Sequence, residues 1–270
     1  MKPSEVGFIV AIIILSIFFL YPFYVLFLIA FEPVRYTFGS LYPSQIPLGF
    51  TLSNVRSALT SLSLIGPLER SFYVAMIVAV LALLFGISAG YGLSRISPKI
   101  ANTIVVLLFF SNMMPGIVVA IPIASEFLKF GLYDNFMGIA LAQELVVLPL
   151  SVFIMLGAFR SVPRELFLQA RVDGAGIFAS LARVILPLVI PGLIVTFLLS
   201  WMTSWDEFTY AVIISPGAPT YPVKLYDYVS RALPFQASAF ALIVTIPVLV
   251  IAAFLQRYLK GQYLTGGLVG

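Results

Sequence analysis

The stretch FRSVPRELFLQARVDGAGIFASLARVILPLVIP, residues 159–191, decides the fold of this chain. It predicts a short helix, a tight turn and a second helix. Pro163 suits the first turn of a helix, where a missing N–H costs nothing, and Glu165 favours the positive end of the helix dipole. The helix can run to about Val172, where Asp173-Gly174 stops it, because Gly accepts the left-handed conformation of a helix C-cap and Asp tolerates turns. An amphipathic run over 177–186 then leads into an apolar segment.

Composition places the rest of the chain in a bilayer. Of 270 residues, 61% are hydrophobic and 10% charged, and the mean hydropathy is +1.09, which an aqueous globule of this size could not accommodate. Cysteine and histidine are both absent from the sequence, which removes disulfides, thiolate nucleophiles and the usual zinc and imidazole chemistry. We therefore expect no catalytic residue, metal site or cofactor. The net charge of +4 indicates Lys and Arg at the cytoplasmic faces of a membrane protein, not nucleic-acid binding.

The apolar runs predict an all-α, polytopic membrane protein with about six transmembrane helices and a single domain over residues 1–270. Each run is long enough to cross a hydrocarbon core of about 30 Å. The first is too long for a signal peptide. Met113 and Pro115 predict a kink or local unwinding in the third span, and Gly86, Gly90 and Gly92 in the second predict close helix packing. The expected spans are 8–30, 71–93, 100–123, 137–158, 188–209 and 237–258, with outer loops at 31–70 and 215–236 and a polar connection at 125–136.

Basic residues predict the orientation. If the connection at 159–187 is cytoplasmic, nine of the 15 Lys and Arg residues lie inside, in the shorter segments where the positive-inside rule counts them. Both termini are then cytoplasmic. The inner set is Lys2, Arg95, Lys99, Arg160, Arg164, Arg171, Arg183, Arg257 and Lys260.

The same connection resembles the EAA loop of the membrane-spanning subunits of ATP-binding-cassette (ABC) importers. The matching residues are Ser161, Pro163, Glu165, Ala170, Arg171, Asp173, Gly174, Ala175, Arg183, Leu186, Pro187 and Pro191. The resemblance implies a cytoplasmic coupling loop, 159–187, whose helix docks into a groove of an ATPase through Glu165, Ala170, Arg171, Asp173, Gly174 and Ala175. One departure is clear: the Glu-Ala-Ala triplet falls on Leu168-Gln169-Ala170, so the salt bridge of that glutamate cannot be carried over.

From about Thr51 to the end, the chain is similar to the carbohydrate-importer branch of these permeases. The matching stretches are Leu52-Ser53-Asn54, Met114-Pro115-Gly116, Phe130 to Asp134, Trp205 to Phe208, Gln256-Arg257-Tyr258 and Leu264 to Gly267. The resemblance implies a type I importer bundle in the cell membrane. It also implies a heterodimer with a second permease subunit, two ATPase subunits, an extracellular solute-binding protein and a sugar as substrate. A phosphate-binding loop GxxxxGK[ST] is absent from the sequence, so ATP is expected to be bound by another polypeptide.

Acidic residues in or near the spans are candidates for the substrate path, because intramembrane charges are expensive and usually face a cavity. Glu144 lies about seven residues, or roughly 10 Å, inside the outer end of its span. Asp206 and Glu207 close the fifth span beside Trp205 and Phe208. Carboxylates with flat aromatic faces suit a polyol, although Trp is also a common interfacial anchor.

Three alternatives stay open. A polyamine permease would also use acidic residues near the membrane. An ion-driven secondary carrier would need no ATPase, although the sequence has no visible internal repeat. An intramembrane enzyme is disfavoured. Without His or Cys, catalysis would need Ser with Lys or a pair of carboxylates, and the sequence offers no such pair in adjacent spans at matching depth except Glu144 with Asp206.

Overall fold

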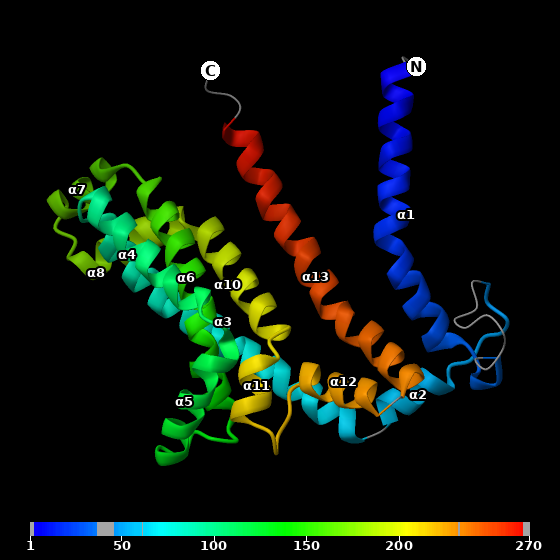
Figure 1. Ribbon diagram of the computed structural model, residues 1–270. Coiled ribbons are helices and arrows are strands. Elements are labelled where there is room, and N and C mark those ends of the chain that lie inside the picture. Colours follow the sequence, from blue (N-terminus) through cyan, green and yellow to red (C-terminus); the bar gives the residue numbers. More distant parts are fainter. Residues whose placement is uncertain (1–2, 37–45, 61, 232, 267–270) are drawn as a thin grey trace. The chain divides into compact units, whose positions relative to one another are not determined.

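The computed structural model describes residues 3–36, 46–60, 62–231 and 233–266, and every regular element in those residues is helical (Figure 1). The prediction of an all-α fold is therefore confirmed. Lys2, part of the expected outer loop (37–45 and 61) and the last four residues of the tail lie outside the described residues. The helices are α1 (Pro3–Phe31), α2 (Ser53–Thr60), α3 (Leu62–Ser94), α4 (Pro98–Phe110), α5 (Gly116–Lys129), α6 (Phe136–Arg160), α7 (Arg164–Val172), α8 (Ile177–Ser180), α9 (Leu186–Leu188), α10 (Ile190–Trp205), α11 (Thr209–Ile214), α12 (Tyr221–Ser230) and α13 (Pro234–Gly266).

Four of these helices are long and apolar enough to cross a membrane: α1, α3, α6 and α13. Two bent pairs meet the same criterion if each counts as one span, which brings the total in the described residues to six. The first pair is α4 with α5, bent by 89°. The second joins 177–188 to α10 with a bend of 78°. The number of expected spans agrees with the structure when both broken pairs are counted.

The helix boundaries differ from the expected spans at three places. Helix α3 begins at Leu62, within the expected outer loop, because Leu64 and Pro67 lie one turn apart on a buried face. Helix α5 continues to Lys129 through the expected polar connection. Helix α13 runs on to Gly266, beyond the expected end of the sixth span at Tyr258.

The chain divides into two compact units, residues 1–68 with 224–247 and residues 69–223 with 248–270. In the first unit, the end of α1 is tied to α2 by Asn54. Its amide donates hydrogen bonds to the carbonyls of Ala30 and Glu32, both at 3.1 Å. These are C-terminal carbonyls with no partner inside α1. Asn54 therefore acts as a side-chain cap for α1, and Phe31 stacks on Phe50 beside it, with ring centroids 5.3 Å apart.

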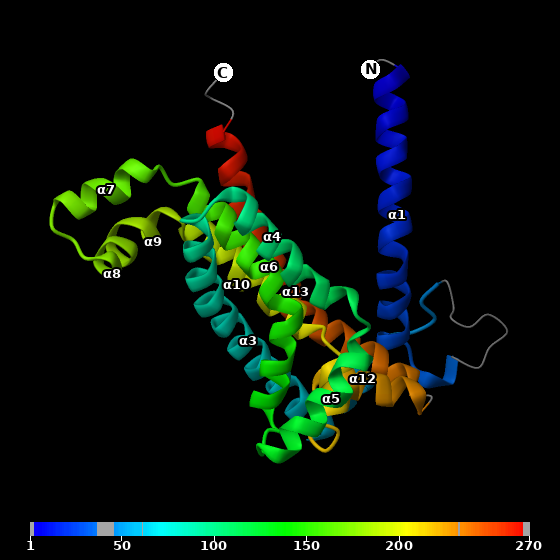
Figure 2. The ribbon, with the colours of Figure 1, turned by 60° about the vertical axis from the view of Figure 1, so that its left-hand side comes forward.

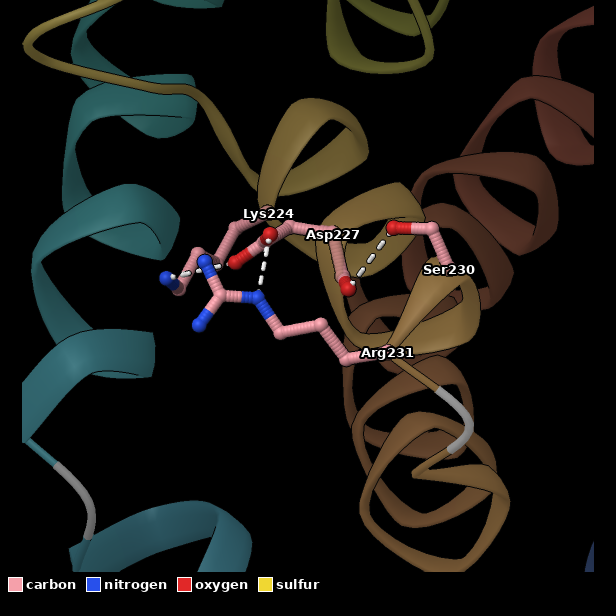
Figure 3. Close-up of polar contacts among 4 residues, drawn as sticks. All are labelled: Lys224, Asp227, Ser230 and Arg231. Carbon is pink, nitrogen blue, oxygen red and sulfur yellow. Dashed lines mark hydrogen bonds and ion pairs between the residues drawn. The ribbon is translucent and has the colours of Figure 1, made fainter.

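The first unit also carries a charged cluster at the end of α12. Lys224 and Arg231 both point at the carboxylate of Asp227, at 3.1 and 2.8 Å (Figure 3). Ser230 donates a hydrogen bond to the backbone carbonyl of Asp227 at 3.0 Å. The pKa of the Asp227 carboxyl is lowered, chiefly because Lys224 donates a hydrogen bond to it, and Arg231 adds to this effect. When the Asp227 carboxylate is ionised, the cluster stabilises the last turn of α12.

In the second unit, α6 is the central helix, and α4, α10 and α11 pack against it. Two glycines let neighbouring backbones approach it. A Cβ on Gly90 of α3 would lie 2.7 Å from Met155 Cβ, and one on Gly192 of α10 would lie 2.6 Å from Ala158 Cβ. Gly92 has open space instead, since no atom from elsewhere in the residues described by the structure lies within 4 Å of its Cβ position. The prediction of close packing is confirmed for Gly90 and wrong for Gly92.

The break between α4 and α5 confirms the predicted kink, and it is held against α6. Pro149 removes a backbone N–H from α6 and frees the carbonyl four residues earlier, that of Leu145. Ser111, in the 3₁₀ turn at the break (η2, Ser111–Met113), donates a hydrogen bond to this carbonyl at 3.3 Å. Asn112 donates to the next carbonyl, that of Val146, at 3.1 Å. The carbonyl that Pro149 leaves without a donor in α6 is thus satisfied by a side chain at the bend between α4 and α5.

Candidate functional site

Helix α7 and the turn after it have the local structure that the sequence predicts. Pro163 precedes the first helical residue, and Glu165 lies in the first turn. At the other end, Gly174 adopts a φ of +86°. The N–H of Ala175 bonds the carbonyl of Ala170 at 3.0 Å, and the N–H of Gly174 bonds that of Arg171 at 3.1 Å. These two bonds make a Schellman motif, so the predicted Asp-Gly stop is confirmed.

Large apolar side chains on α7 and α8 are left in the open. Val172 is 86% exposed, Phe178 87% and Leu168 60%. The residues on one side of α7 line a shallow depression, which we call the α7 surface: Glu165, Leu168, Gln169, Val172 and Asp173. Exposed apolar groups rimmed by polar ones are typical of a surface that binds another protein.

The six predicted docking residues do not all share this exposure. Glu165, Arg171, Asp173 and Gly174 are exposed and Ala175 is half-buried, whereas Ala170 is buried within the chain. Apart from its chain neighbours, none of the described residues has an atom within 4 Å of the Cβ position of Gly174, so they leave room there for a close approach. Sequence reasoning missed Leu168 and Val172 as surface residues, although their spacing of four residues on one helix could have indicated it.

Helix α7 is joined firmly to the spans. The guanidinium of Arg95, at the C-terminal end of the α3 region, lies 4.3 Å from the ring centre of Phe167 and 4.8 Å from that of Tyr91. Tyr91 also meets Phe159 of α6 edge-on at 5.6 Å. A cation between two aromatic rings is attracted by both π-faces. Through these contacts, α7 is connected to α3 and α6 at the same time.

The return limb of the loop reaches the same part of α6. Residues 181–185 form a π-helical segment (η3, Leu181–Ile185) between α8 and α9. Ile185 and Val189 are buried and pack in one cluster with Met155 and Phe159 of α6. In Figures 1 and 2, α7 and α8 lie at one end of the second unit and α5 at the other. Both limbs of the loop are therefore anchored on the same end of α6.

At the other end of the fifth span, the buried Gln143 and the partly buried Glu207 form a polar cluster. Gln143 accepts a hydrogen bond from Ser204 at 2.5 Å and donates one to Glu207 at 3.1 Å. The other contacts of Glu207 are the backbone N–H groups of Tyr210 and Ala211, at 2.8 and 3.2 Å. These are orphan donors at the start of α11. Glu207 therefore caps α11 and marks the break between α10 and α11.

The other predicted substrate-path residues have different surroundings. Trp205 is 1% exposed and stacks on Trp201, with ring centroids 4.7 Å apart. Asp206 is exposed and accepts a hydrogen bond from the hydroxyl of Tyr221. Phe208 is half-buried. The structure thus brings Trp205 and Asp206 together around Tyr221, which also packs on Trp205 at 4.8 Å.

Glu144 is isolated from these groups. Its side chain lies on α6 and is buried, with 5% exposed. Neither carboxylate oxygen has a hydrogen-bond partner among the residues that the structure describes. Burying a carboxyl group without a hydrogen-bond partner costs free energy, and no contact of Glu144 with the described residues offsets that cost.

A cavity of about 240 Å³ lies between α6, α10 and the break after α4. Its polar lining consists of hydroxyl and amide groups: Asn112, Ser151, Thr196, Ser200 and Thr203. Sequence reasoning missed these residues, because single hydroxyls in apolar helices commonly bond their own backbone. The spacing of Thr196, Ser200 and Thr203, four and three residues apart, was the available signal, since it places them on one face of α10.

The described residues thus define a multi-pass helical membrane protein, with an exposed helix–turn–helix packed against the ends of its spans. The chain belongs to the family of binding-protein-dependent transport system inner membrane components, whose model matches residues 82–262.

Individual relatives agree with this assignment. The ABC transporter permease protein ORF1 of Streptomyces antibioticus is 32% identical over 82% of this chain and 98% of its own length. The trehalose/maltose transport system permease protein MalG of Thermococcus litoralis is 28% identical over 97% of this chain and 96% of its own. A crystal structure of a bacterial ABC transporter that imports the acidic polysaccharide alginate contains a chain of the same fold. The TM-score is 0.67 at 20% identity, covering 96% of this chain and 98% of that one.

Proposed function

We propose that this chain is one permease subunit of an ABC importer that carries a carbohydrate across the cell membrane. It would work as a heterodimer with a second permease subunit, together with two ATPase subunits and an extracellular solute-binding protein. Membership of the binding-protein-dependent family supports the assembly. The names of relatives that transport trehalose and maltose favour a sugar as substrate. The sequence lacks a phosphate-binding loop, in keeping with ATP bound by separate subunits.

The observation that carries the proposal is the α7 surface. It is exposed, partly apolar and clamped to α3 and α6 through Phe167 and Arg95. A protein docked there could move the spans as a rigid body, because the contacts between α7 and the bundle are packed rings and not a loose linker. The docking residues in this proposal are Glu165, Ala170, Arg171, Asp173, Gly174 and Ala175, and the exposed Val172 joins them.

We place the α7 end of the second unit in the cytoplasm, with both termini on the same side. Basic residues gather at this end, which the positive-inside rule favours. Arg160 of α6 donates a hydrogen bond to Asn102 of α4 at 2.9 Å, and Arg95 contacts α7, so these two cations lie at one level. Lys99, Arg164, Arg171 and Arg183 belong to the same connections.

The proposed substrate path runs along Glu144, Trp205, Asp206, Glu207 and Phe208. Asp206 and Glu144 are the members that support this best, because Asp206 is exposed and the Glu144 carboxylate is unpartnered among the described residues. Glu207 has a separate task at the start of α11.

Val172→Asp tests the docking in the complete complex. Val172 is 86% exposed, so the change does not disturb the packing of the chain, but it places a charge on the apolar part of the α7 surface. We expect the ATPase to be lost on copurification and sugar uptake to stop. The matched control is Phe130→Asp, which alters another highly exposed apolar residue, 73%, between α5 and α6. Normal ATPase recovery and uptake with Val172→Asp would refute the docking.

Orientation and substrate class need separate measurements. Because the chain has no cysteine, Val172→Cys and Phe130→Cys each introduce one thiol. In sealed right-side-out vesicles of cells that lack the ATPase, an impermeant reagent should reach Phe130→Cys and spare Val172→Cys; the reverse pattern would invert the topology. Uptake of labelled mono- and disaccharides, with spermidine as competitor, separates a sugar importer from a polyamine importer. ATP-independent uptake by this chain alone would indicate a secondary carrier.

A further inference from the structure

The cavity between α6, α10 and the break after α4 contains a hydroxyl group that its surroundings leave unsatisfied. Thr196 is fully buried, and its Oγ1 has no hydrogen-bond partner among the described residues. Its neighbours behave differently: Ser151 donates to the carbonyl of Val147 and Thr203 to that of Leu199, both at 2.9 Å. Donation to the carbonyl four residues earlier is the usual solution for a hydroxyl in a helix. Thr196 forgoes it, and a buried unpaired hydroxyl costs about 1–3 kcal/mol.

The remaining polar groups are arranged along the same cavity. Ser151 and Ser200 share a hydrogen bond of 3.1 Å across the α6–α10 contact, and each oxygen keeps a lone pair for a further donor. Asn112 stands at the side of the break, donating to Val146. Hydroxyl and amide groups from three elements therefore converge on one small volume.

The charge and size of the cavity restrict what it could hold. None of the described residues that line it is ionisable, so it offers nothing to balance the charges of a polyamine. Its volume of about 240 Å³ is just below the ~300–1,000 Å³ of pockets for drug-sized ligands. The apolar part of the lining includes Phe109, whose ring could pack on the C–H face of a sugar.

We propose that this cavity is a subsite for one ring of a neutral carbohydrate, with the hydroxyl of Thr196 as a direct ligand and Ser200 beside it. The inference rests on the proposed function and adds residues that the acidic and aromatic candidates do not include. A sugar hydroxyl satisfies Thr196, and the Ser151–Ser200 pair accepts further hydrogen bonds. The absence of charge selects against cations and anions, because an ion could be bound there only without a counter-charge.

Two substitutions at Thr196 separate ligand binding from packing. Thr196→Val keeps the shape and removes the hydroxyl. As a ligand, that hydroxyl contributes one neutral hydrogen bond, so the KM for uptake should rise about 2- to 10-fold while stability is unchanged or improved. Thr196→Ser should restore the KM. A packing role predicts the opposite: Thr196→Val would be harmless to uptake, and Thr196→Ser, which loses a methyl group, would be the poorer variant.

Occupancy is measured by thiol protection in the complete complex. Since the chain has no cysteine, Ser200→Cys places one thiol in the cavity, and Ser57→Cys on the exposed α2 serves as control. A water-soluble methanethiosulfonate reagent is applied with the solute-binding protein and a panel of labelled mono- and disaccharides that includes maltose and trehalose. A sugar that is imported should slow modification of Ser200→Cys about tenfold when it fills the cavity nine-tenths of the time, and leave Ser57→Cys unaffected.

The outcomes separate the two proposals. If the wild-type complex imports a sugar but that sugar does not protect Ser200→Cys, or if Thr196→Val leaves the KM unchanged, the subsite is refuted and the importer stands. A thiol at position 200 that is never modified in an active complex means that solutes do not reach this part of the cavity, and this also refutes the subsite. If the wild-type complex imports no sugar in the panel, the carbohydrate function fails and the subsite fails with it.

Discussion

Gly90→Ala should weaken the contact between α3 and α6, and the structure allows the size of the effect to be worked out. The new Cβ would lie 2.7 Å from Met155 Cβ, 2.9 Å from the Met155 carbonyl carbon and 3.0 Å from the Leu156 nitrogen. Carbon atoms in contact prefer about 3.5–4.0 Å, so the two helices must separate by roughly 1 Å. Two of the three atoms belong to the backbone, which cannot rotate away. Overpacking of this kind costs typically 1–3 kcal/mol.

Gly92→Ala is the matched control, because it lies two residues further along the same helix and its Cβ would have nothing within 4 Å. Both substitutions gain up to about 1 kcal/mol of helix propensity, since Ala is favoured over Gly in a helix. The difference between the two variants therefore isolates the packing cost of about 1–3 kcal/mol.

The assay is the midpoint of thermal unfolding, followed by size-exclusion chromatography of the heated complex. For a chain of this size, 1 kcal/mol corresponds to about 2–4 °C, so Gly90→Ala should unfold roughly 2–12 °C below Gly92→Ala. The uptake rate of Gly90→Ala should also fall, because Met155 packs in the cluster that anchors the proposed coupling loop. Equal midpoints for the two variants would refute the close α3–α6 contact.

Three further predictions use the same complex. Arg95→Met keeps the apolar stem but removes the cation between the rings of Tyr91 and Phe167, so the number of ATP molecules hydrolysed per sugar imported should rise. The control is Lys99→Met, which removes an exposed neighbouring cation and should leave that ratio unchanged. An unchanged ratio in both variants would count against the contact of Arg95 with the two rings. Glu207→Ala should cost about 1–3 kcal/mol of stability, because it leaves the buried Gln143 amide unpaired. Glu207→Gln keeps one acceptor and should lower the thermal unfolding midpoint less. Equal losses of stability in the two variants would contradict the capping role. Asp227 has a lowered pKa, so its ion pairs protect α12 at neutral pH and are lost as the pH falls below 3.8, the ordinary pKa of an aspartate. Hydrogen exchange of α12 should therefore be faster in Asp227→Asn than in wild type at pH 7, and this difference should disappear on acidification. A difference that does not depend on pH would exclude the carboxylate as its cause.

Local signals in the sequence were sufficient for the local structure. Pro163 and Asp173-Gly174 bracket a helix that the structure confirms, because caps and turns depend on neighbouring residues alone. The kink near Pro115 was predictable for the same reason. What the sequence did not disclose was the partner of each span. Gly90 and Gly92 have equivalent sequence contexts, and which of them faces α6 depends on the rotation of α3.

The substrate-path prediction illustrates the same limit at the level of function. The charge of Glu207 was a signal of a special environment, but its contact with Gln143 joins residues 64 positions apart, which no spacing rule reveals. In contrast, Thr196 carries no charge and was overlooked. The Thr196 hydroxyl stands out because it has no hydrogen-bond partner among the described residues, and such an absence can be seen in a structure but not in a sequence.

The anchoring of the proposed coupling loop restricts how motion could reach the cavity. Phe167 of α7 and Ile185 of the return limb pack in one cluster with Phe159 of α6, so we expect a push on α7 to displace α6 and the start of α10 together. Two walls of the cavity belong to these helices and should keep their spacing. The third wall, at the break after α4, is held to α6 by packing of Phe109 on Phe153 and by single hydrogen bonds from Ser111 and Asn112 to carbonyls beside Pro149. Each of these bonds is worth only about 0.5–1.5 kcal/mol net. The cluster that anchors the loop includes no residue of this break, so the break is the part of the lining that the loop does not hold directly.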